Sequence, residues 1–333
     1  MKNKIQEYLL QLIHPELNQK FILEKNIKSI IDNNDGINIS IELNFPYKSQ
    51  EILYEKIIKD GLKKITDLNI TIKWSLKILS RLAQKGVNSI KGVKNIIAIA
   101  SGKGGVGKSS TAANLALALS SEGANVGILD ADIYGPSQPK MLGISQKPKS
   151  KDGKSMEPIM IHDIQIMSIG FLVDQETPMV WRGPMVTSTL EQLLNETNWD
   201  NLDYLIIDLP PGTGDIQLTL AQKIPVTGAI IVTTPQDIAL LDARRGLKMF
   251  EKVNIPILGI VENMSTHICS NCNHEEHIFG KDGGEKMCAD YNTELLGSLP
   301  LDINIRQDLD DGTPTVIKDP TSKISEMYRL IAR

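Results

Sequence analysis

Residues 101–111 of the chain read SGKGGVGKSST. This motif follows an apolar run rich in β-branched residues at 93–100 (VKNIIAIA) and precedes a segment of helix-forming residues at 112–120 (AANLALALS). These flanks predict a strand before the motif and a helix after it. The order of glycines, lysine and serine is typical of a P-loop, in which backbone N–H groups surround a polyphosphate at a helix N-terminus. Because the flanks agree with that pattern, we expect a phosphate-binding loop rather than a glycine-rich turn without a ligand.

The P-loop pattern predicts what the residues of the motif do. Lys108 is expected to reach the β- and γ-phosphates as a catalytic residue, and Ser109 to offer its hydroxyl to Mg²⁺. Glycine is needed because a Cβ would block the close approach of the backbone to the phosphates. The residues of this loop that we expect to bind ATP are Gly102, Lys103, Gly104, Gly105, Val106, Gly107, Lys108, Ser109 and Ser110.

Two predicted strands end in aspartates. Residues 123–130 (GANVGILD) end on Asp130, and Asp132 comes two positions later. Residues 202–208 (LDYLIID) end on Asp208. Parallel strands present their carboxyl ends at one edge of a sheet, where ligands bind. The second segment has the Walker B arrangement, in which Asp208 holds Mg²⁺ through water. The alternative for the first segment is an ordinary turn, since Asp, Gly, Pro and Ser all favour turns.

Further apolar runs alternate with helical patterns along the chain. Residues 229–234 and 257–262 predict two buried strands, and residues 238–253 predict a helix between them. Strands that alternate with helices favour an α/β fold with a doubly wound, mostly parallel sheet.

The first part of the chain predicts a separate unit. Residues 1–79 predict a small N-terminal α/β domain, near the lower size limit for independent folding. Residues 80–92 are polar and glycine-containing, which predicts a linker, so the P-loop domain should span 93–333. The elements expected in the small domain are a helix at 3–13, strands at 21–31 and 37–43 joined by a turn at 33–36, a helix at 49–65 and a strand at 70–74.

Composition limits the classes of partner. The 333 residues carry a formal net charge of −4, which gives no general attraction to nucleic acid or anionic lipid. Residues 1–90 contain 14 basic and 10 acidic residues, whereas the remainder contains 22 and 30, which supports two domains. No apolar run approaches about 18 residues, and only 3 cysteines occur. We therefore expect a cytoplasmic protein with neither nucleic-acid nor membrane partners.

A second lysine, Lys103, lies inside the loop. The segment KGGVGKS is similar to the deviant Walker A motif of the ATPases related to nitrogenase iron protein and to the partition and division-site positioning proteins. In that group the extra lysine reaches the partner's phosphates across a nucleotide-sandwich homodimer. The resemblance therefore implies that Lys103 neutralises transition-state charge in trans, as an arginine finger does. The alternative is a solvated loop lysine.

The same resemblance implies roles for three more side chains. Asp132 would position or activate the attacking water as a catalytic residue, and Asp130 would support the Mg²⁺ shell. Asn263 directly follows the strand at 257–262, and its amide has the donor and acceptor that suit an adenine edge. For Asn263 the alternative is an ordinary turn residue.

Two of the three cysteines, Cys269 and Cys272, form a C-x-x-C. Zinc and iron–sulfur clusters both accept two thiolates on one side of a turn. Further ligands come either from a second copy of the chain or from His274 and His277, which would complete an intrachain zinc site. The histidine spacing is tighter than in the familiar zinc finger. We expect Cys288 to lie on a helix, in the core.

Several further motifs together resemble one family. From residue 93 to its end the chain looks like the Mrp/ApbC family of iron–sulfur cluster carrier ATPases. The resemblance implies a slow ATPase whose homodimer holds a bridging 4Fe-4S cluster on Cys269 and Cys272 and passes it to apoproteins. It also implies that Pro300 lies by the adenine, and a cluster-assembly scaffold is a possible further partner. The motifs are DADIYGPSQP, WRGPM, DYLIIDLPPGTGDIQLTL, TTPQDIALLDARRG, GIVENMS with its downstream C-x-x-C, and LLGSLPLDINIRQDLDDGTP.

The alternative function is a positioning ATPase of the partition or division type with a structural zinc. Membrane-bound members of that class use a basic amphipathic C-terminal helix. Residues 321–333 have helical apolar spacing, but Lys323, Arg329 and Arg333 are set against Glu326, which predicts a final helix packed on the sheet. The cysteine pair has no use in this function, so the sequence favours the carrier.

Overall fold

The structure, a computed structural model, describes residues 1–33, 36–81, 87–172, 183–269, 271–272 and 274–333. Two residues of the predicted turn at 33–36 and the start of the WRGPM motif therefore lie outside the described residues. The contacts divide the chain into two compact units. The smaller contains Met1–Leu79, Ser121–Ala124 and Arg333, and the larger contains Ser80–Ser120 and Asn125–Ala332. The first boundary falls between Leu79 and Ser80, where the predicted linker begins.

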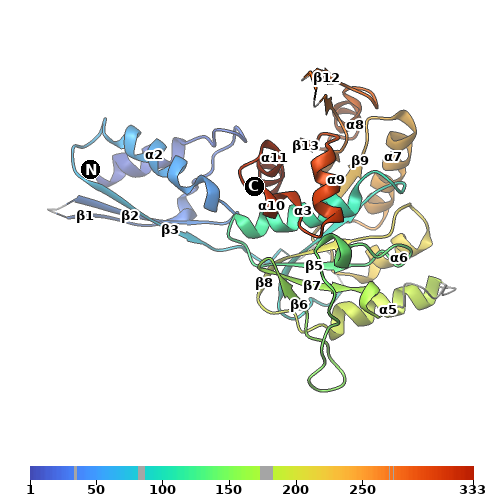
Figure 1. Cartoon of the computed structure of the whole chain (residues 1–333). Helices are drawn as coiled ribbons and strands as arrows, with labels where there is room; N and C mark the ends of the chain where they lie inside the picture. The colour runs from blue at the N-terminus through green and yellow to red at the C-terminus, as the bar shows by residue number, and fades with distance from the viewer. Residues whose placement is uncertain (34–35, 82–86, 173–182, 270, 273) are drawn as a thin grey trace. The chain divides into compact units, whose positions relative to one another are not determined.

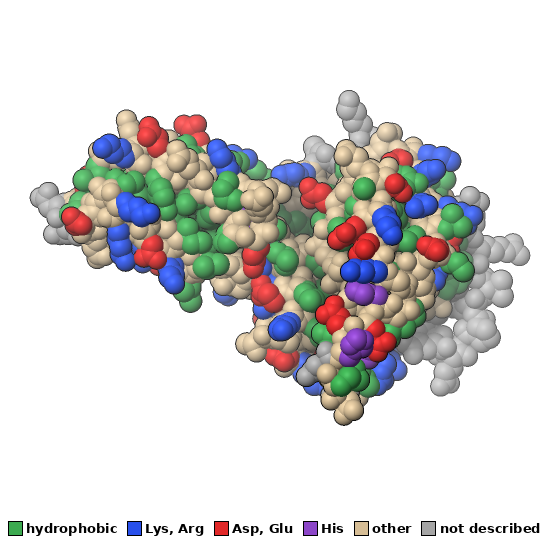
Figure 2. All heavy atoms as spheres, turned by 90° about the horizontal axis from the view of Figure 1, so that it is seen from above, with side chains coloured by type: hydrophobic (Ala, Val, Ile, Leu, Met, Phe, Trp, Pro, Cys, Tyr) green, Lys and Arg blue, Asp and Glu red, His purple; other side chains and the backbone are tan. Residues whose placement is uncertain are grey.

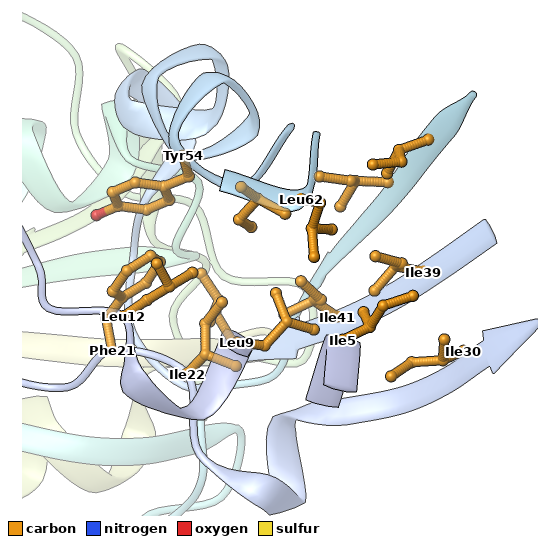
Figure 3. Close-up of a cluster of buried hydrophobic side chains, with 14 of the residues drawn as sticks. Ile5, Leu9, Leu12, Phe21, Ile22, Ile30, Ile39, Ile41, Tyr54 and Leu62 are labelled. Atoms are coloured by element: carbon orange, nitrogen blue, oxygen red, sulfur yellow. The ribbon is translucent and has the colours of Figure 1, made fainter. Parts of the chain in front are cut away.

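The smaller unit packs two helices on a three-stranded sheet of order β1-β2-β3. β1 is antiparallel to β2, and β2 is parallel to β3. Figure 3 shows the apolar core, in which Ile5 and Leu9 of α1 and Leu62 of α2 cluster with Ile39 and Ile41 of β2. The elements are α1 (Lys2–Gln11), β1 (Ile27–Asn33), β2 (Gly36–Leu43), α2 (Glu51–Leu62) and β3 (Ile70–Leu76), with 3-10 turns at Glu24–Asn26 and Lys48–Gln50.

The first strand of this unit is shorter than predicted. The prediction began it at residue 21, but residues 24–26 form a 3-10 turn. The cause is Asn26, whose Oδ1 accepts the backbone N–H of Leu23 at 2.8 Å and whose Nδ2 donates to the carbonyl of Glu42 at 2.7 Å. An Asn side chain that bonds nearby backbone groups competes with strand pairing.

The larger unit is built on an eight-stranded sheet of order β13-β10-β9-β4-β8-β5-β7-β6. Its pairs are parallel except for β6 with β7, so the predicted doubly wound, mostly parallel fold is confirmed. The strands are β4 (Val93–Ala100), β5 (Val126–Asp130), β6 (Ile159–Ile161), β7 (Ile164–Ser168), β8 (Leu202–Asp208), β9 (Gly228–Thr233), β10 (Ile257–Glu262) and β13 (Leu295–Ser298). A two-stranded hairpin, β11 (His267–Ile268) with β12 (Glu275–Glu276), stands apart from this sheet.

Helices cover the large sheet in Figure 1: α7 packs on β9, α8 packs on β10, and α5 and α6 pack on each other. The longest, α7, has 16 residues, and among the described helices none combines the length and hydrophobicity needed to cross a bilayer. The helices are α3 (Lys108–Ser121), α4 (Gln138–Met141), α5 (Gly183–Glu196), α6 (Asp215–Lys223), α7 (Asp237–Lys252), α8 (Gly283–Tyr291), α9 (Ile303–Asp310), α10 (Thr315–Lys318) and α11 (Lys323–Ala332), with a 3-10 turn at Ile169–Phe171.

Candidate nucleotide site and cysteine pair

The P-loop lies between β4, which ends at Ala100, and α3, which begins at Lys108. Gly105 and Gly107 have φ angles of +81° and +83°, which L residues rarely adopt. A Cβ on Gly107 would also lie 2.1 Å from Nδ2 of Asn263. The loop therefore requires glycine at position 107 for two independent reasons.

Two neighbouring elements close around the P-loop. Nδ2 of Asn263, which directly follows β10, donates to the carbonyl of Val106 at 2.9 Å. A Cβ on Gly102 would lie 2.1 Å from the carbonyl carbon of Asp242, in α7. The chain after β10 and the helix α7 thus hold the loop backbone on two sides, which limits how the loop can move.

The structure also brings Asn263 and Pro300 to the same edge of the sheet. They follow the neighbouring strands β10 and β13. The carbonyl of Leu299 accepts both the backbone N–H of Ser265 at 2.9 Å and its hydroxyl at 3.0 Å. This contact joins the two chain segments directly beside Asn263 and Pro300.

Lys108 lies in a buried cluster of charges. Its Nζ is 2.5 Å from Oδ1 of Asp208 and 3.4 Å from Oδ2 of Asp132. It also donates to the hydroxyl of Ser109 at 3.3 Å. The Lys108 side chain is 6% exposed and that of Asp208 is 0% exposed. Charges removed from water to this degree depend on their partners, and the pairing of β4 with β8 brings these partners together.

Asp130 is fully buried, and its carboxylate anchors the loop after β5. It accepts hydrogen bonds of 3.0–3.2 Å from the backbone N–H groups of Asp132, Ser137 and Gln138 and from the hydroxyl of Ser168. Burial, and then the charge of Asp208, raises the pKa of Asp130 to about 7. Asp130 therefore holds the loop that carries Asp132, and any support that it gives to a Mg²⁺ shell is indirect in this geometry.

The oxygen atoms around Lys108 fit a magnesium ion. Burial raises the pKa of Asp132, and the charge of Lys108 opposes that rise. Oδ2 of Asp132 faces Lys108, whereas Oδ1 is buried without a hydrogen-bond partner among the described residues. Mg²⁺ prefers carboxylate and hydroxyl oxygens, and Asp208 and Ser109 provide them beside Asp132.

Lys103 lies at the rim of the loop, half-buried beside the exposed Gly104 and Gly105. Its Nζ donates to Oε1 of Gln236 at 3.3 Å, and its carbonyl accepts the hydroxyl of Ser101 at 2.9 Å. The two lysines of the motif thus have different partners, since Lys108 contacts the buried carboxylates and Lys103 contacts the residue before α7.

The cysteine pair lies between the strands of the β11–β12 hairpin. Cys269 is half-buried and Cys272 is exposed. The backbone N–H groups of Asn271 and Cys272, in that order of effect, lower the pKa of Cys269. A lowered thiol pKa increases the fraction of thiolate, the form that binds metals. The hairpin therefore presents two potential sulfur ligands at the surface.

The intrachain zinc site is not assembled in the part of the chain that the structure describes. There, no group of three His, Cys, Asp or Glu side chains is arranged to hold a metal ion. Nδ1 of His277 instead bonds the carbonyl of Ser265 at 2.9 Å. Histidine and acidic side chains appear at the surface of the larger unit in Figure 2. Within the described residues, one chain therefore offers Cys269 and Cys272 as a pair of ligands.

Comparison with known proteins places the chain. The family model described as "ParA: NUBPL iron-transfer P-loop NTPase" matches residues 92–333. The chain belongs to this family. Membership in the NUBPL iron-transfer family confirms the resemblance inferred from the motifs, and it covers the larger unit from the P-loop strand onward.

Three similar proteins illustrate the NUBPL iron-transfer family and its fold. An iron-sulfur cluster carrier protein of Haemophilus influenzae is 52% identical over 99% of this chain and 90% of its own length. One of Escherichia coli is 55% identical over 96% of this chain and 87% of its own length. A nucleotide-binding protein from Archaeoglobus fulgidus, solved in complex with ADP, is 34% identical over 71% of this chain and 93% of that chain, with a TM-score of 0.62.

Two polar residues of the site, and one residue next to it, were not found by sequence reasoning. Gln138 is fully buried, and its Nε2 donates to the carbonyl of Ser109 at 3.0 Å and to Oδ2 of Asp208 at 2.9 Å. Gln236 contacts Lys103, as described above, and Glu262 bonds the start of α8. Within the motifs of this NUBPL-family chain, glutamine and glutamate carry no distinctive spacing, so only the fold reveals these contacts.

Proposed function

We propose that this chain is a cytoplasmic, ATP-binding and ATP-hydrolysing iron–sulfur cluster carrier. Two copies bind one 4Fe-4S cluster between them through Cys269 and Cys272 of each, and they pass it to apo iron–sulfur proteins. The cluster is cargo rather than a resident cofactor. The names of the relatives support this proposal, since they are called cluster carriers at 52% and 55% identity.

One observation carries the proposal: the chain presents two thiols, with no third metal ligand beside them in the described residues. A 4Fe-4S cluster takes four cysteines. Two copies of the hairpin supply that number, whereas one copy supplies half. Because Cys272 is exposed and Cys269 half-buried, the cluster would remain accessible to a recipient, which suits transfer better than a buried site.

The P-loop residues bind and orient ATP in this proposal. The glycines bring backbone N–H groups to the phosphates, and Lys108 leaves its carboxylate partners to contact the β- and γ-phosphates. Asn263 and Pro300 contact the adenine from the ends of β10 and β13. Mg²⁺, when bound through Ser109 and Asp208, neutralises phosphate charge. Asp132 orients the attacking water and accepts its proton.

In this proposal hydrolysis is slow because one chain alone lacks a charge that stabilises the transition state. Lys103 lies at the rim of the loop and contacts Gln236, not the buried cluster around Lys108. We propose that it completes the site of a second subunit, where it stabilises transition-state charge in trans. Hydrolysis would then depend on the homodimer that also holds the cluster.

Anaerobic reconstitution with iron and sulfide tests the proposal. Iron, acid-labile sulfide and zinc are measured per chain for the wild type and for the double variant Cys269→Ala/Cys272→Ala. A bridged cluster gives about two irons and two sulfides per chain, in a dimer, and both are lost in the variant. The single variant Cys288→Ala is the matched control, because that buried thiol lies on α8 and should not affect the yield.

Two results would argue against the carrier. Zinc bound to the cysteines without iron would favour the positioning ATPase with a structural zinc. An iron content that is unchanged in the double variant would mean that the cysteine pair does not bind the cluster. Transfer is then measured separately, as activation of an apo 4Fe-4S enzyme by the reconstituted dimer.

A further inference from the structure

The cysteine hairpin is part of a longer segment, residues 264–282, whose start is attached to the P-loop. The residue before it is Asn263, which donates to the carbonyl of Val106. The same amide nitrogen lies so close to Gly107 that a Cβ added there would be 2.1 Å from it. The P-loop backbone is therefore in direct contact with the first anchor of this segment.

The end of the segment is held by Glu262, the residue next to Asn263. Glu262 is 5% exposed, and its Oε2 accepts the backbone N–H of Gly284 at 2.5 Å, in the first turn of α8. A Cβ on Gly284 would lie 2.9 Å from the same oxygen, so the two groups are closely packed. Adjacent residues of β10 and its following turn thus contact the P-loop and the helix that closes the cysteine segment.

A second close contact is made by Gly283, the residue next to Gly284. A Cβ on Gly283 would lie 2.9 Å from the carbonyl of Pro235. The next residue, Gln236, accepts the hydrogen bond from Lys103. The start of α8 therefore packs against two residues, Glu262 and Pro235, and each is followed in sequence by a residue that contacts the P-loop.

The base of the segment is closed on itself. The bond from His277 to the carbonyl of Ser265 joins residues on either side of the hairpin. The two chain segments that lead into and out of the hairpin are therefore held together at its base. A helix start that needed only a cap would be served by an exposed Ser, Thr or Asp, whereas here the acceptor is a buried carboxylate on the central sheet.

We propose that Glu262 is a positioning residue that couples the nucleotide state of the P-loop to the reactivity of Cys269 and Cys272. Nucleotide binding changes the contact of Asn263 with the loop, and Glu262 passes the change to α8 and so to the cysteine segment. The use of this coupling, to hold or release a cluster, rests on the proposed function. The contact itself requires no cluster.

The test measures thiol alkylation in the full chain, reduced, anaerobic and free of metal. A Cys288→Ala background leaves Cys269 and Cys272 as the two thiols. Iodoacetamide alkylation is followed by mass spectrometry with and without saturating Mg²⁺-ADP, and nucleotide affinity is measured in parallel with a fluorescent ADP. We compare Glu262 with Glu262→Ala, which removes the acceptor, and with Glu262→Gln, whose amide oxygen still accepts from Gly284.

We expect Mg²⁺-ADP to change the alkylation rate of the parent chain by about fivefold or more, a size typical of coupled sites. Glu262→Gln should keep this response. Glu262→Ala should lose it while its affinity for ADP stays within about threefold of the parent, since an alteration beyond that would place Glu262 in nucleotide binding itself. A parent chain without a nucleotide response, or a Glu262→Ala variant that retains it, overturns the proposal.

A second variant keeps the test decisive if Glu262→Ala fails to fold, as judged by circular dichroism. Gly284→Ala leaves the carboxylate in place but puts a Cβ 2.9 Å from Oε2, so it disturbs the same contact from the helix side. It should reduce the nucleotide response, and a full response overturns the coupling. No iron is present in any arm, so a negative result here does not depend on whether reconstitution yields a cluster.

Discussion

Replacing Lys108 by methionine removes an ammonium that lies 2.5 Å from Asp208 and 3.4 Å from Asp132. Methionine retains an unbranched apolar side chain, so the change mainly deletes charge. Asp208 is 0% exposed and cannot gain water in exchange without rearrangement. Removing one partner of a buried ion pair costs about 3–5 kcal/mol. We expect a loss of that size in the free energy of unfolding at about pH 8, without nucleotide.

The loss should depend on pH in a defined direction. Burial already raises the pKa of Asp132, and Lys108 opposes this, so the variant raises it further. A carboxyl whose pKa is higher in the folded chain than in the unfolded chain destabilises the fold only where the unfolded carboxyl is ionised. The penalty is therefore absent well below the unfolded pKa of about 4 and complete above the folded pKa. The difference between variant and wild type should shrink from about pH 8 toward pH 5.

Urea unfolding followed by indole fluorescence measures the effect. A Trp74→Phe background removes the tryptophan of the smaller unit, so that the signal comes from the larger unit. Lys223→Met is the matched control, because Lys223 and its partner Glu191, at 2.9 Å, are 47% and 33% exposed. Its loss should be at most about 1 kcal/mol. Equal losses in the two variants, or a Lys108→Met loss that grows toward acid pH, would refute the reasoning.

Three further predictions concern the loop and the cysteines. Gly107→Ala should lower the free energy of unfolding by about 1–3 kcal/mol. Gly104→Ala should change it by at most about 0.5 kcal/mol, because the added Cβ meets no atom within 4 Å. Equal losses in urea titrations would contradict this. Lys103→Ala should keep ADP affinity but slow ATP turnover by about a hundredfold or more, and unchanged phosphate release would exclude a role in trans. The alkylation rate of Cys269 should rise at a lower pH than for an ordinary cysteine, because backbone N–H groups lower its pKa. Burial raises the pKa of Cys288 to about 11, so Cys288 should react only after unfolding. Mass spectrometry of the native chain checks both.

The sequence predicted helices and strands that depend on residues adjacent in the chain. The strand at 202–208 and the strand at 257–262 have the predicted bounds, because short apolar runs with a polar end are a local signal. The helix predicted at 112–120 begins earlier, at Lys108, since the last residues of the P-loop motif already turn as a helix. The strand predicted at 123–130 begins later than predicted, at Val126, because its first three residues belong to the connection between α3 and β5.

Contacts between segments that are far apart in the sequence could not be predicted from the sequence motifs. Gln138 reaches Asp208 across 70 positions, and Lys103 reaches Gln236 across 133. These pairs exist because β8 lies next to β5 and β9 lies next to β4, and strand order is not written in any one motif. The weak strands of the β11–β12 hairpin also escaped prediction, since two-residue strands have no measurable periodicity.

The separation of these partners also bears on how the chain is made. During synthesis, Lys108 emerges 100 residues before Asp208, and Val106 emerges 157 residues before Asn263. A growing chain therefore has a P-loop segment long before it has the walls of a nucleotide site. Parallel strands paired across such distances fold slowly, because loop closure precedes their contacts. Nucleotide should consequently favour only chains that are finished and folded, and in refolding experiments it should act on the last phase and leave the early ones unchanged.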